Sequence, residues 1–467
     1  AAGEDYFEFR QPSAGTLQLL VGPNQAGAVV VDTRPLSLVS SYTINGADGN
    51  DLLNVNYGAA GGEFDLDIAF NGQAPTASPG DTLEITGGTA DTLTFNYIDV
   101  NDGNVQIDFD GGGVDSTITY TGLEPITNTG TVTNVEFNLP NSANPDVALQ
   151  SAGSGLNQLS GSTFENTTFA NPTVGGSLTI NGGTAADTIS VQGVGSGFDA
   201  DLTIDADTDD TITFQTTATS IGNGDLTADA LTINVNAAVT TAGSGGIDVD
   251  AVRNVHVSST GSLTTTGTGN ISVVGQGMAA GNYHGVEING SISSTGSGTI
   301  SIGGTSVATT GDFDGVRIGG AGAQVTSAVA GDISITGTSS GDDGVESSGG
   351  AVVSATGTAS VTFDGTATSN NDGANGVVLD GTATMVTAAD GSISITGETS
   401  SFNAGVQPEA GVFVQGATVE TTGTTAGTGL IEVFGTGGSA GIEMEDGTFR
   451  TVAGNIEWTG DSADNVG

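Results

Sequence analysis

Residues 331–337 read Gly-Asp-Ile-Ser-Ile-Thr-Gly, and residues 391–397 repeat them closely as Gly-Ser-Ile-Ser-Ile-Thr-Gly. Within each copy Ile alternates with small polar residues, which is the period of a β-strand that has one apolar and one polar face. Glycine stands at both ends of each copy, where tight corners are needed. Related copies occupy residues 269–275, 298–303, 361–363, 429–435 and 454–460.

A second motif, Gly-Val-x-apolar or a close variant of it, follows these strands. Its glycines are Gly285, Gly315, Gly344, Gly376, Gly411 and Gly441. A third short strand follows each, as at residues 291–294, 324–327, 383–387 and 418–421. Three strands in fixed order, with a period of roughly thirty residues, predict a right-handed parallel β-helix from about Leu231 to Gly467. Inward positions hold Ile, Val, Leu and Met, while outward positions hold Ser, Thr, Asp and Glu. A β-sandwich is the alternative for this half, but a sandwich does not require such a period.

The chain is therefore expected to be all-β, with two regions. Residues 226–467 are expected to form the regular β-helix and to stop in the middle of a coil. Residues 1–225 are β-rich but less regular, and whether they continue the same solenoid stays open. Between residues 139 and 172, Pro140, Pro145 and Pro172 interrupt the alternation, which predicts an irregular excursion.

The strongly negative net charge of the chain limits the classes of molecule that it can bind. The 467 residues include 53 acidic residues against 5 arginines and no lysine, for a net charge of −48. Nucleic acids and anionic membranes need a cationic face, so we expect neither nucleic-acid binding nor membrane insertion. Such a charge favours cation binding and a salty extracellular medium. Cysteine is absent, so stacking of repeats must supply the stability instead of disulfides.

Four acidic turns between strands form a weaker repeat in the N-terminal region, at residues 42–53, 83–93, 178–189 and 202–212. Calcium prefers six to eight oxygen ligands, which clustered carboxylates and turn carbonyls can supply. The candidate metal ligands are Asp48, Asn50, Asp51, Asp187, Asp207, Asp209 and Asp210. The other interpretation is that Asp and Asn are simply good turn residues.

These turns resemble the Gly-Gly-x-Gly-x-Asp-x-apolar calcium repeat of RTX proteins. The matching residues are Gly46, Gly49, Asp51 and Leu53 in one copy, and Gly182, Gly183, Asp187 and Ile189 in another. Ala47 and Ala185 replace glycines of the motif, and no two copies stand in tandem. Two further segments also resemble parts of large secreted bacterial β-solenoid surface proteins of adhesin or haemagglutinin type. They are the Leu-Thr-Ile-Asn-Gly-Gly segment at residues 178–183 and the segment at residues 121–126. The resemblance implies Ca²⁺ as the candidate cofactor.

The loops before the Gly-Val strands carry further acids, which stacking would align on one edge. They are Asp312, Asp314, Asp342, Asp343, Asp372, Glu409, Asp461 and Asp464. A cation ladder or ligand groove is one interpretation of this edge, and a solvated edge that prevents aggregation is the other. We expect His256 to point outward and Trp458 to occupy an inward position. His284, beside Tyr283, could contact a ligand.

No catalytic constellation is recognisable, although Arg253 and Arg317 could serve as a base. We expect a non-enzymatic, extracellular structural protein of a bacterial surface, either a stiff filament or sheath subunit or an adhesin stalk. Its partners would be copies of itself stacked end to end, a continuation of a longer chain, or glycans. The last residues, 464–467, read as the opening of another coil. The alternatives are a carbohydrate-active β-helix enzyme, such as a polysaccharide lyase or hydrolase, and a glycan-binding module.

Overall fold

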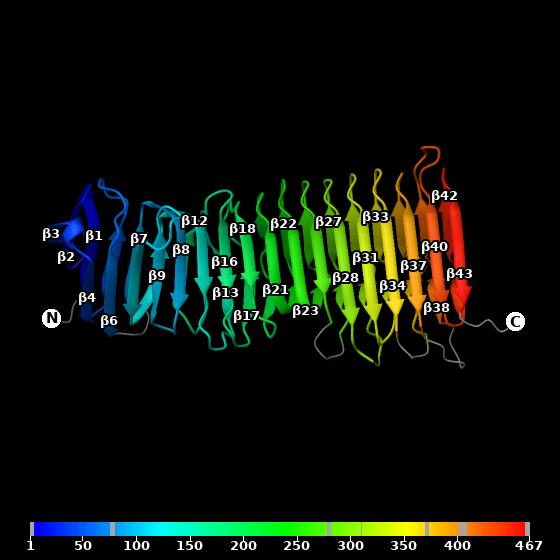
Figure 1. Cartoon of the computed structure of the whole chain (residues 1–467), viewed down its shortest axis with the longest axis horizontal. Helices are drawn as coiled ribbons and strands as arrows, with labels where there is room; N and C mark the ends of the chain where they lie inside the picture. Colours follow the sequence, from blue (N-terminus) through cyan, green and yellow to red (C-terminus); the bar gives the residue numbers. More distant parts are fainter. Residues whose placement is uncertain are drawn as a thin grey trace. The chain divides into compact units, whose positions relative to one another are not determined.

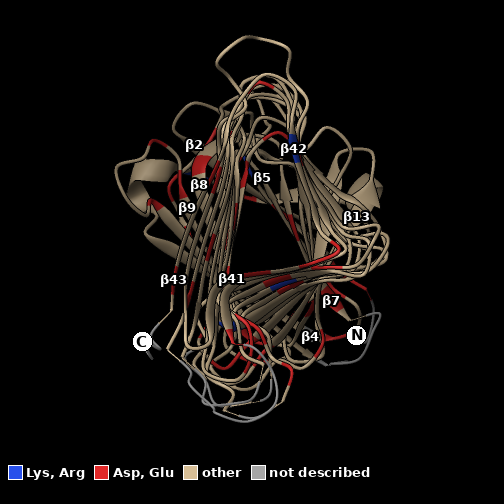
Figure 2. Cartoon of the chain, turned by 90° about the vertical axis from the view of Figure 1, so that its right-hand side faces the viewer, with Lys and Arg blue, Asp and Glu red and all other residues tan. Residues whose placement is uncertain are grey.

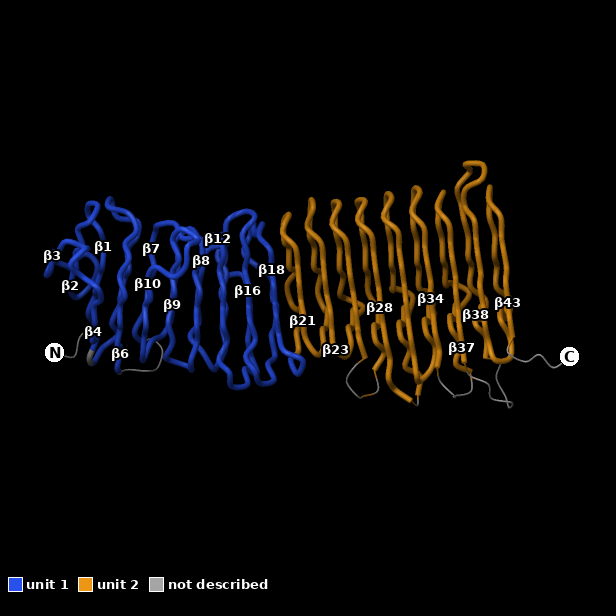
Figure 3. The backbone as a smooth tube through the Cα atoms, in the orientation of Figure 1, with its two compact units in different colours: residues 1–210 blue, residues 211–467 orange. Residues whose placement is uncertain are grey.

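The computed structural model describes residues 4–74, 80–277, 281, 283–309, 311–368, 373–400 and 409–462. The chain divides into two compact units, residues 1–210 and residues 211–467, drawn in blue and orange in Figure 3. Regular structure among the described residues is β-strand apart from two short 3-10 helices, η1 (Gln25–Gly27) and η2 (Leu36–Leu38). The expected all-β class is confirmed. The described residues contain no helix whose length and apolarity would let it cross a membrane.

In unit 2, residues 211–467, the repeat builds three ladders of parallel strands. The strands follow one another in chain order along each ladder (Figure 1). Figure 2 looks along the ladders and places β41 (Ala440–Glu445), β42 (Thr448–Thr451) and β43 (Ile456–Ser462) on three different sides of the interior. Parallel ladders of this kind are solenoid-like and differ from the antiparallel sheets of a sandwich.

Each repeat contributes one strand to each ladder. Ladder one contains β25 (Ile271–Gly275), β28 (Ile300–Ser306), β31 (Ile333–Ser339), β34 (Val361–Ala367), β37 (Ile393–Thr399), β40 (Ile431–Gly437) and β43. Ladder two contains β26 (Val286–Ile288), β29 (Val316–Gly319), β32 (Val345–Ser348), β35 (Val377–Asp380), β38 (Ala410–Gln415) and β41. Ladder three contains β20 (Thr219–Ile221), β22 (Ala238–Thr241), β24 (Ser262–Thr265), β27 (Ser291–Ser294), β30 (Gln324–Ser327), β33 (Val352–Ala355), β36 (Met385–Ala388), β39 (Thr418–Thr421) and β42. The unit also contains β19 (Thr211–Phe214) and the longer strands β21 (Leu226–Val235) and β23 (Ile247–Val257).

The core of unit 2 is a set of apolar stacks inside these ladders. Ile300 pairs with Ile333, Ile333 with Val361, and all three side chains are buried. Burying a side chain of this size stabilises the fold by about 1.5–3 kcal/mol. Met385 corrects the prediction that methionine points inward: it is 37% exposed, because the buried neighbour Val386 takes the inward position of β36. Trp458 pairs with the buried Val433 but is itself 43% exposed.

Unit 1, residues 1–210, contains mostly parallel pairs as well. Its strands are β1 (Tyr6–Ser13), β2 (Thr16–Gly22), β3 (Val29–Pro35), β4 (Ser41–Asp48), β5 (Leu52–Asn56), β6 (Asp67–Ala74), β7 (Asp81–Thr86), β8 (Thr89–Tyr97), β9 (Gly103–Asp108), β10 (Ser116–Thr121), β11 (Leu123–Asn128), β12 (Thr131–Asn138), β13 (Val147–Gly153), β14 (Leu156–Ser160), β15 (Thr167–Ala170), β16 (Ser177–Asn181), β17 (Thr188–Gln192) and β18 (Asp201–Asp205). Parallel series run β1–β5–β7–β11–β15, β4–β6–β10 and β8–β12–β16–β18. The parallel arrangement is therefore present in this less regular half too.

Antiparallel strands interrupt unit 1 in three places: β1–β2–β3, β8–β9–β10 and β13–β14–β15. The last of these lies in the 139–172 segment, where the sequence predicted an irregular excursion. In that segment β13 also pairs in parallel with β17, and β15 with β11. These inserted antiparallel strands explain why the N-terminal sequence lacks a regular period.

Candidate functional site

A line of buried polar side chains links successive repeats of unit 2, and we call it the corner ladder. Its members are His284, Asp314, Asp343 and Asn375, each of which directly precedes the glycine that opens a ladder-two segment. Each side chain accepts the backbone N–H of the same position one repeat later. The donor–acceptor distances are 2.9 Å from Asp314 N to His284 Nδ1, 3.2 Å from Asp343 N to Asp314 Oδ1, 2.7 Å from Asn375 N to Asp343 Oδ1 and 2.9 Å from Ala410 N to Asn375 Oδ1. A buried N–H left unpaired is costly, so the ladder ties each repeat to the next.

Unit 1 contains similar links of opposite direction, in which the later side chain accepts the earlier N–H. Three of the four acceptors, Asp51, Asp187 and Asp210, are residues that the sequence proposed as calcium ligands, and Asp81 is the fourth. Asp51 Oδ1 accepts the N–H of Asp5 at 2.7 Å, and Asp81 Oδ1 accepts the N–H of Asp51 at 2.6 Å. The second pair is alike: Asp187 Oδ1 accepts the N–H of Asn144 at 2.7 Å, and Asp210 Oδ1 accepts that of Asp187 at 2.6 Å. These aspartates are buried. Their position at the corners therefore has a structural reason.

The remaining predicted ligands of unit 1 lie nearer the solvent. Asp48 is exposed at the end of β4, and Asn50 is half-buried in the following turn. Asp207 and Asp209 are exposed, and the backbone N–H of Asp207 donates to Asp210 Oδ2 at 2.7 Å. Among the described residues, the groups of three or more metal-ligating side chains include none of the seven predicted ligands. Calcium at these turns stays a prediction.

One acidic group of unit 1, Asp108, Asp110 and Asp115, does not need a cation. Asp108 Oδ1 accepts the N–H groups of Asp110 and Gly111, and its Oδ2 accepts that of Gly113. These backbone hydrogen bonds hold the pKa of Asp108 below its usual value, against the opposing effect of desolvation. The loop itself therefore stabilises the negative charge.

In unit 2, several acidic side chains lie close to one another at one corner of the stacked repeats. We call Asp312, Asp314, Asp342, Asp343 and Glu346 the acidic cluster. Carboxylate oxygens of Asp312, Asp314 and Glu346 lie within 4.8 Å of one another, as do those of Asp314, Asp342 and Asp343. Asp314 belongs to both groups and is fully buried, whereas the side chain of Asp312 is 67% exposed. The cluster thus reaches from the interior to the solvent.

Arg317 supplies one positive charge at the cluster. Its Nη1 lies 3.5 Å from Asp312 Oδ2, and its Nε lies 3.3 Å from Glu346 Oε2. Arg317 stands on β29 between Glu287 and Glu346 of the neighbouring strands, which pair with it in register. The arginine considered from sequence as a catalytic base is therefore an ion-pair partner.

Burial dominates the electrostatics of the cluster. It raises the pKa of Asp314 and Asp343 well above the usual aspartate value, and neighbouring carboxylates add to the effect. Burial and the charge of Asp312 raise the pKa of Asp342 to about 7. Burial also lowers the pKa of His284. Because Nδ1 of His284 accepts the N–H of Asp314, the proton of the neutral ring is on Nε2.

Sequence reasoning placed four members of the cluster on one acidic edge but missed Glu346. The sequence feature that could have identified Glu346 is its outward position in β32, two residues after Gly344. At that position it pairs with Arg317 of the preceding repeat. Glu409 is buried and Asp461 lies on β43, and neither belongs to the cluster. Asp372 and Asp464, and the whole 464–467 segment, are outside the described residues. Figure 2 shows acidic positions gathered near the lower corner below β41.

Tyr283 and His256, two residues noted in the sequence, each contact a charged side chain nearby. The guanidinium of Arg253 lies 4.3 Å from the centre of the Tyr283 ring, a cation–π contact. His256 points outward between the buried Val255 and Val257, as expected, and its Nε2 is 3.8 Å from Glu287 Oε2. Both arrangements are structural contacts on the outer surface.

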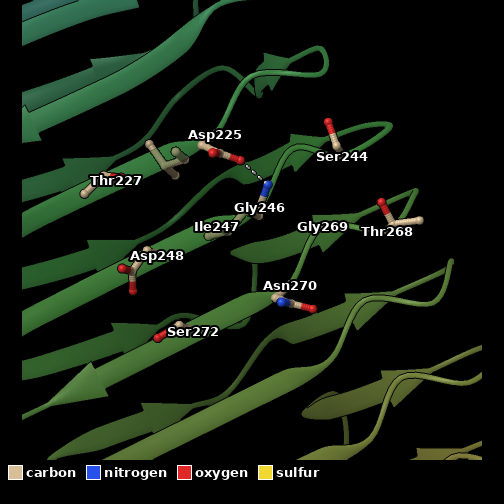
Figure 4. Close-up of a pocket in the computed structure, with 11 residues that line it drawn as sticks. Asp225, Thr227, Ser244, Gly246, Ile247, Asp248, Thr268, Gly269, Asn270 and Ser272 are labelled. Carbon is tan, nitrogen blue, oxygen red and sulfur yellow. Dashed lines mark hydrogen bonds between the residues drawn. The ribbon is translucent and has the colours of Figure 1, made fainter.

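A polar groove crosses the starts of β21, β23 and β25 (Figure 4). Asp225, Asp248 and Asn270 line it together with Gly246 and Gly269. The N–H of Gly246 donates to Asp225 Oδ1 at 2.7 Å. Its lining contains no aromatic residue, so it lacks the flat stacking surface that sugar rings favour.

Comparison of the chain with protein-family models, with curated proteins and with solved structures found no match.

Proposed function

We propose that this chain is a non-enzymatic, extracellular structural protein of a bacterial surface, in which a right-handed parallel β-helix serves as a stiff filament or sheath subunit or as an adhesin stalk. The observation that carries the proposal is the unbroken register of ladder one from Ile271 to Ile456. Parallel crossover connections are right-handed in nearly all proteins, which supports that hand.

Continuous backbone pairing favours a mechanical role. From β25 to β43 the described repeats pair with one another through three ladders, and the corner ladder adds buried hydrogen bonds between repeats. Bending such a stack would have to break several of these bonds together. A spacer or filament must be stiff, and this mechanical role does not require a reactive side chain.

The charge supports the extracellular part of the proposal. A net charge of −48 keeps the chain soluble, and salt weakens the repulsion between its carboxylates. The resemblance to secreted bacterial surface proteins supports the same setting.

Negative-stain electron microscopy of the purified chain tests this proposal, once in CaCl₂ and once after EDTA. We expect stiff rods of uniform width that join end to end. Globular particles in both conditions would overturn the structural role, and separate rods that never join would overturn the filament form in favour of a stalk.

A carbohydrate-active enzyme is the second candidate, because Glu124 and Glu165 form a carboxyl pair. Asn101 Nδ2 donates to Glu124 Oε1 at 3.0 Å and to Glu165 Oε1 at 3.4 Å. Both acids line a groove of about 380 Å³. Burial, with the charge of Glu124, raises the pKa of Glu165 to about 9, so Glu165 is protonated at neutral pH, as a general acid must be.

Incubating the chain with acidic and neutral polysaccharides and measuring released reducing ends tests this second candidate. Release that Glu165→Gln abolishes, and that the exposed-site control Asp205→Asn leaves unchanged, would favour the enzyme. No release above buffer would leave the structural proposal standing alone.

A further inference from the structure

Two carboxylate oxygens of the acidic cluster, Asp314 Oδ2 and Glu346 Oε2, are inaccessible to solvent and have no donor among the described residues when both groups are ionised. A proton shared between Asp314 and Glu346 would join the two side chains by a hydrogen bond. The corner ladder fixes Asp314, because its Oδ1 accepts the N–H of Asp343. Oδ2 is then left facing the cluster. His284 Nδ1 is 3.4 Å from Asp314 Oδ2 but cannot donate to it, since Nδ1 already accepts the N–H of Asp314.

The charges of the cluster do not balance. Its five carboxylates face one arginine, and His284 is held in its neutral form. Arg317 Nε is 3.3 Å from Glu346 Oε2 without hydrogen-bond geometry. A buried ionised carboxylate without a full partner is strongly unfavourable, so either shared protons or a cation must compensate it.

We propose that the acidic cluster is a Ca²⁺ site, with the buried Asp314 and the half-buried Glu346 as its inner ligands and Asp312 as the ligand on the solvent side. The donors are all oxygens, as calcium prefers, and Asp312 leaves an exposed side for water ligands. Asp342 and Asp343 complete the negative charge around Asp314. Zinc is disfavoured because the only nearby nitrogen ligand, His284 Nδ1, is already used as an acceptor.

Arg317 contacts Asp312 and Glu346, two of the three carboxylates that the ion would use, so it competes with calcium. Asn375 occupies the corner position of Asp314 in a later repeat and still accepts the next N–H through its amide oxygen. The variant Asp314→Asn should therefore fold while losing the charge. This makes it a sharper test than removing the side chain.

Isothermal titration with CaCl₂ in 150 mM NaCl tests the site, because this salt screens weak binding to the acidic surface. We expect Asp314→Asn and Glu346→Gln each to remove one tight binding event or to weaken it at least about tenfold. Arg317→Gln should tighten it. Asp364→Asn, which neutralises an exposed carboxylate of β34 outside the cluster, should leave it unchanged.

Circular dichroism and the melting temperature of each variant in EDTA establish that it is folded. Folded Asp314→Asn that binds calcium with the stoichiometry and affinity of the parent chain would overturn the proposal and assign shared protons to the cluster. If Asp314→Asn does not fold, Glu346→Gln decides by the same criterion. Either result is independent of the filament and enzyme proposals.

Discussion

Asp314 Oδ1 accepts the backbone N–H of Asp343, the residue at the same position in the next repeat, at 3.2 Å. In unit 1 the direction is reversed, because the later residue Asp210 accepts the N–H of the earlier residue Asp187, at 2.6 Å. In both units, a polar side chain at the corner before a strand satisfies the main chain of its neighbour. The stacked strands are thus held together at their corners as well as along their lengths.

Removing a corner acceptor should loosen the adjoining turns. Asp187 Oδ1 accepts the N–H of Asn144, and its Oδ2 accepts that of Gly183 at 3.1 Å. Asp187→Ala leaves both buried donors unpaired, so we expect unit 1 to lose about 2–4 kcal/mol of stability. Hydrogen exchange at these two amides should accelerate strongly. The exposed-site variant Asp205→Ala should cost less than about 0.5 kcal/mol, and equal exchange in both variants would contradict the role of the corner acceptor.

The corner aspartates should make stability fall as pH rises. Burial raises the pKa of Asp81 and of Asp210 to about 6, above the value of about 3.9 in an unfolded chain. The folded protein therefore binds more protons than the unfolded chain between these values. The stabilisation is complete below about pH 4 and is lost as pH rises through about 6.

Thermal unfolding between pH 4 and pH 7 measures this effect. Asp81→Asn retains an acceptor for the N–H of Asp51 but does not titrate, so its melting temperature should decline less with pH than that of the parent chain. An identical slope in the two proteins would show that Asp81 does not contribute.

Two adjacent glycines of β28, Gly303 and Gly304, should differ strongly in how well they tolerate substitution by alanine. A Cβ on Gly304 would lie 2.0 Å from the carbonyl oxygen of Gly315, which is backbone and cannot move aside. A Cβ on Gly303 would meet only Val274 Cγ2, at 3.9 Å. We expect Gly304→Ala to destabilise unit 2 by about 3 kcal/mol or more, as overpacking and backbone strain do. Gly303→Ala should be nearly neutral, and calorimetric melting that ranks the two variants equally would contradict the register.

Calcium binding at the acidic cluster should release protons. The pKa of Asp342 is raised to about 7, and those of Asp314 and Asp343 are raised well above the usual value. A cation favours the ionised carboxylates, so apparent affinity should increase from pH 6 to pH 8. Titrations at pH 6.5 in buffers of different ionisation enthalpy count the released protons. Binding that is independent of the buffer would mean that Asp314, Asp342 and Asp343 do not lose protons to the ion, which would contradict binding beside them.

The regular half was predictable because its signal is local and repeated. Alternation around Ile333 and Ile393 gives the inward positions, and the glycines after them give the corners. Register follows, because equivalent residues pair from repeat to repeat. Sequence reasoning could not foresee that the antiparallel insertions of unit 1 sit among parallel strands, since β13 and β14 alternate just as parallel strands do.

The site residues were harder to predict because an aspartate in a turn can either bind a metal ion or accept hydrogen bonds from the main chain. Asp51 and Asp187 match a calcium motif by spacing, yet their oxygens accept buried N–H groups of neighbouring repeats. Only the stacking of repeats reveals such donors. Glu346 lies in the cluster because β32 pairs with β29, which brings it beside Arg317. The sequence alone does not show this contact, because the two residues are far apart along the chain.

The most direct test of the structural role is immunogold electron microscopy of intact cells that make the protein, with an antibody against residues 211–467. We expect gold particles along continuous filaments, sheaths or stalks outside the cell envelope. Gold confined to the cell interior, or an extracellular label that is not associated with any surface structure, would contradict it.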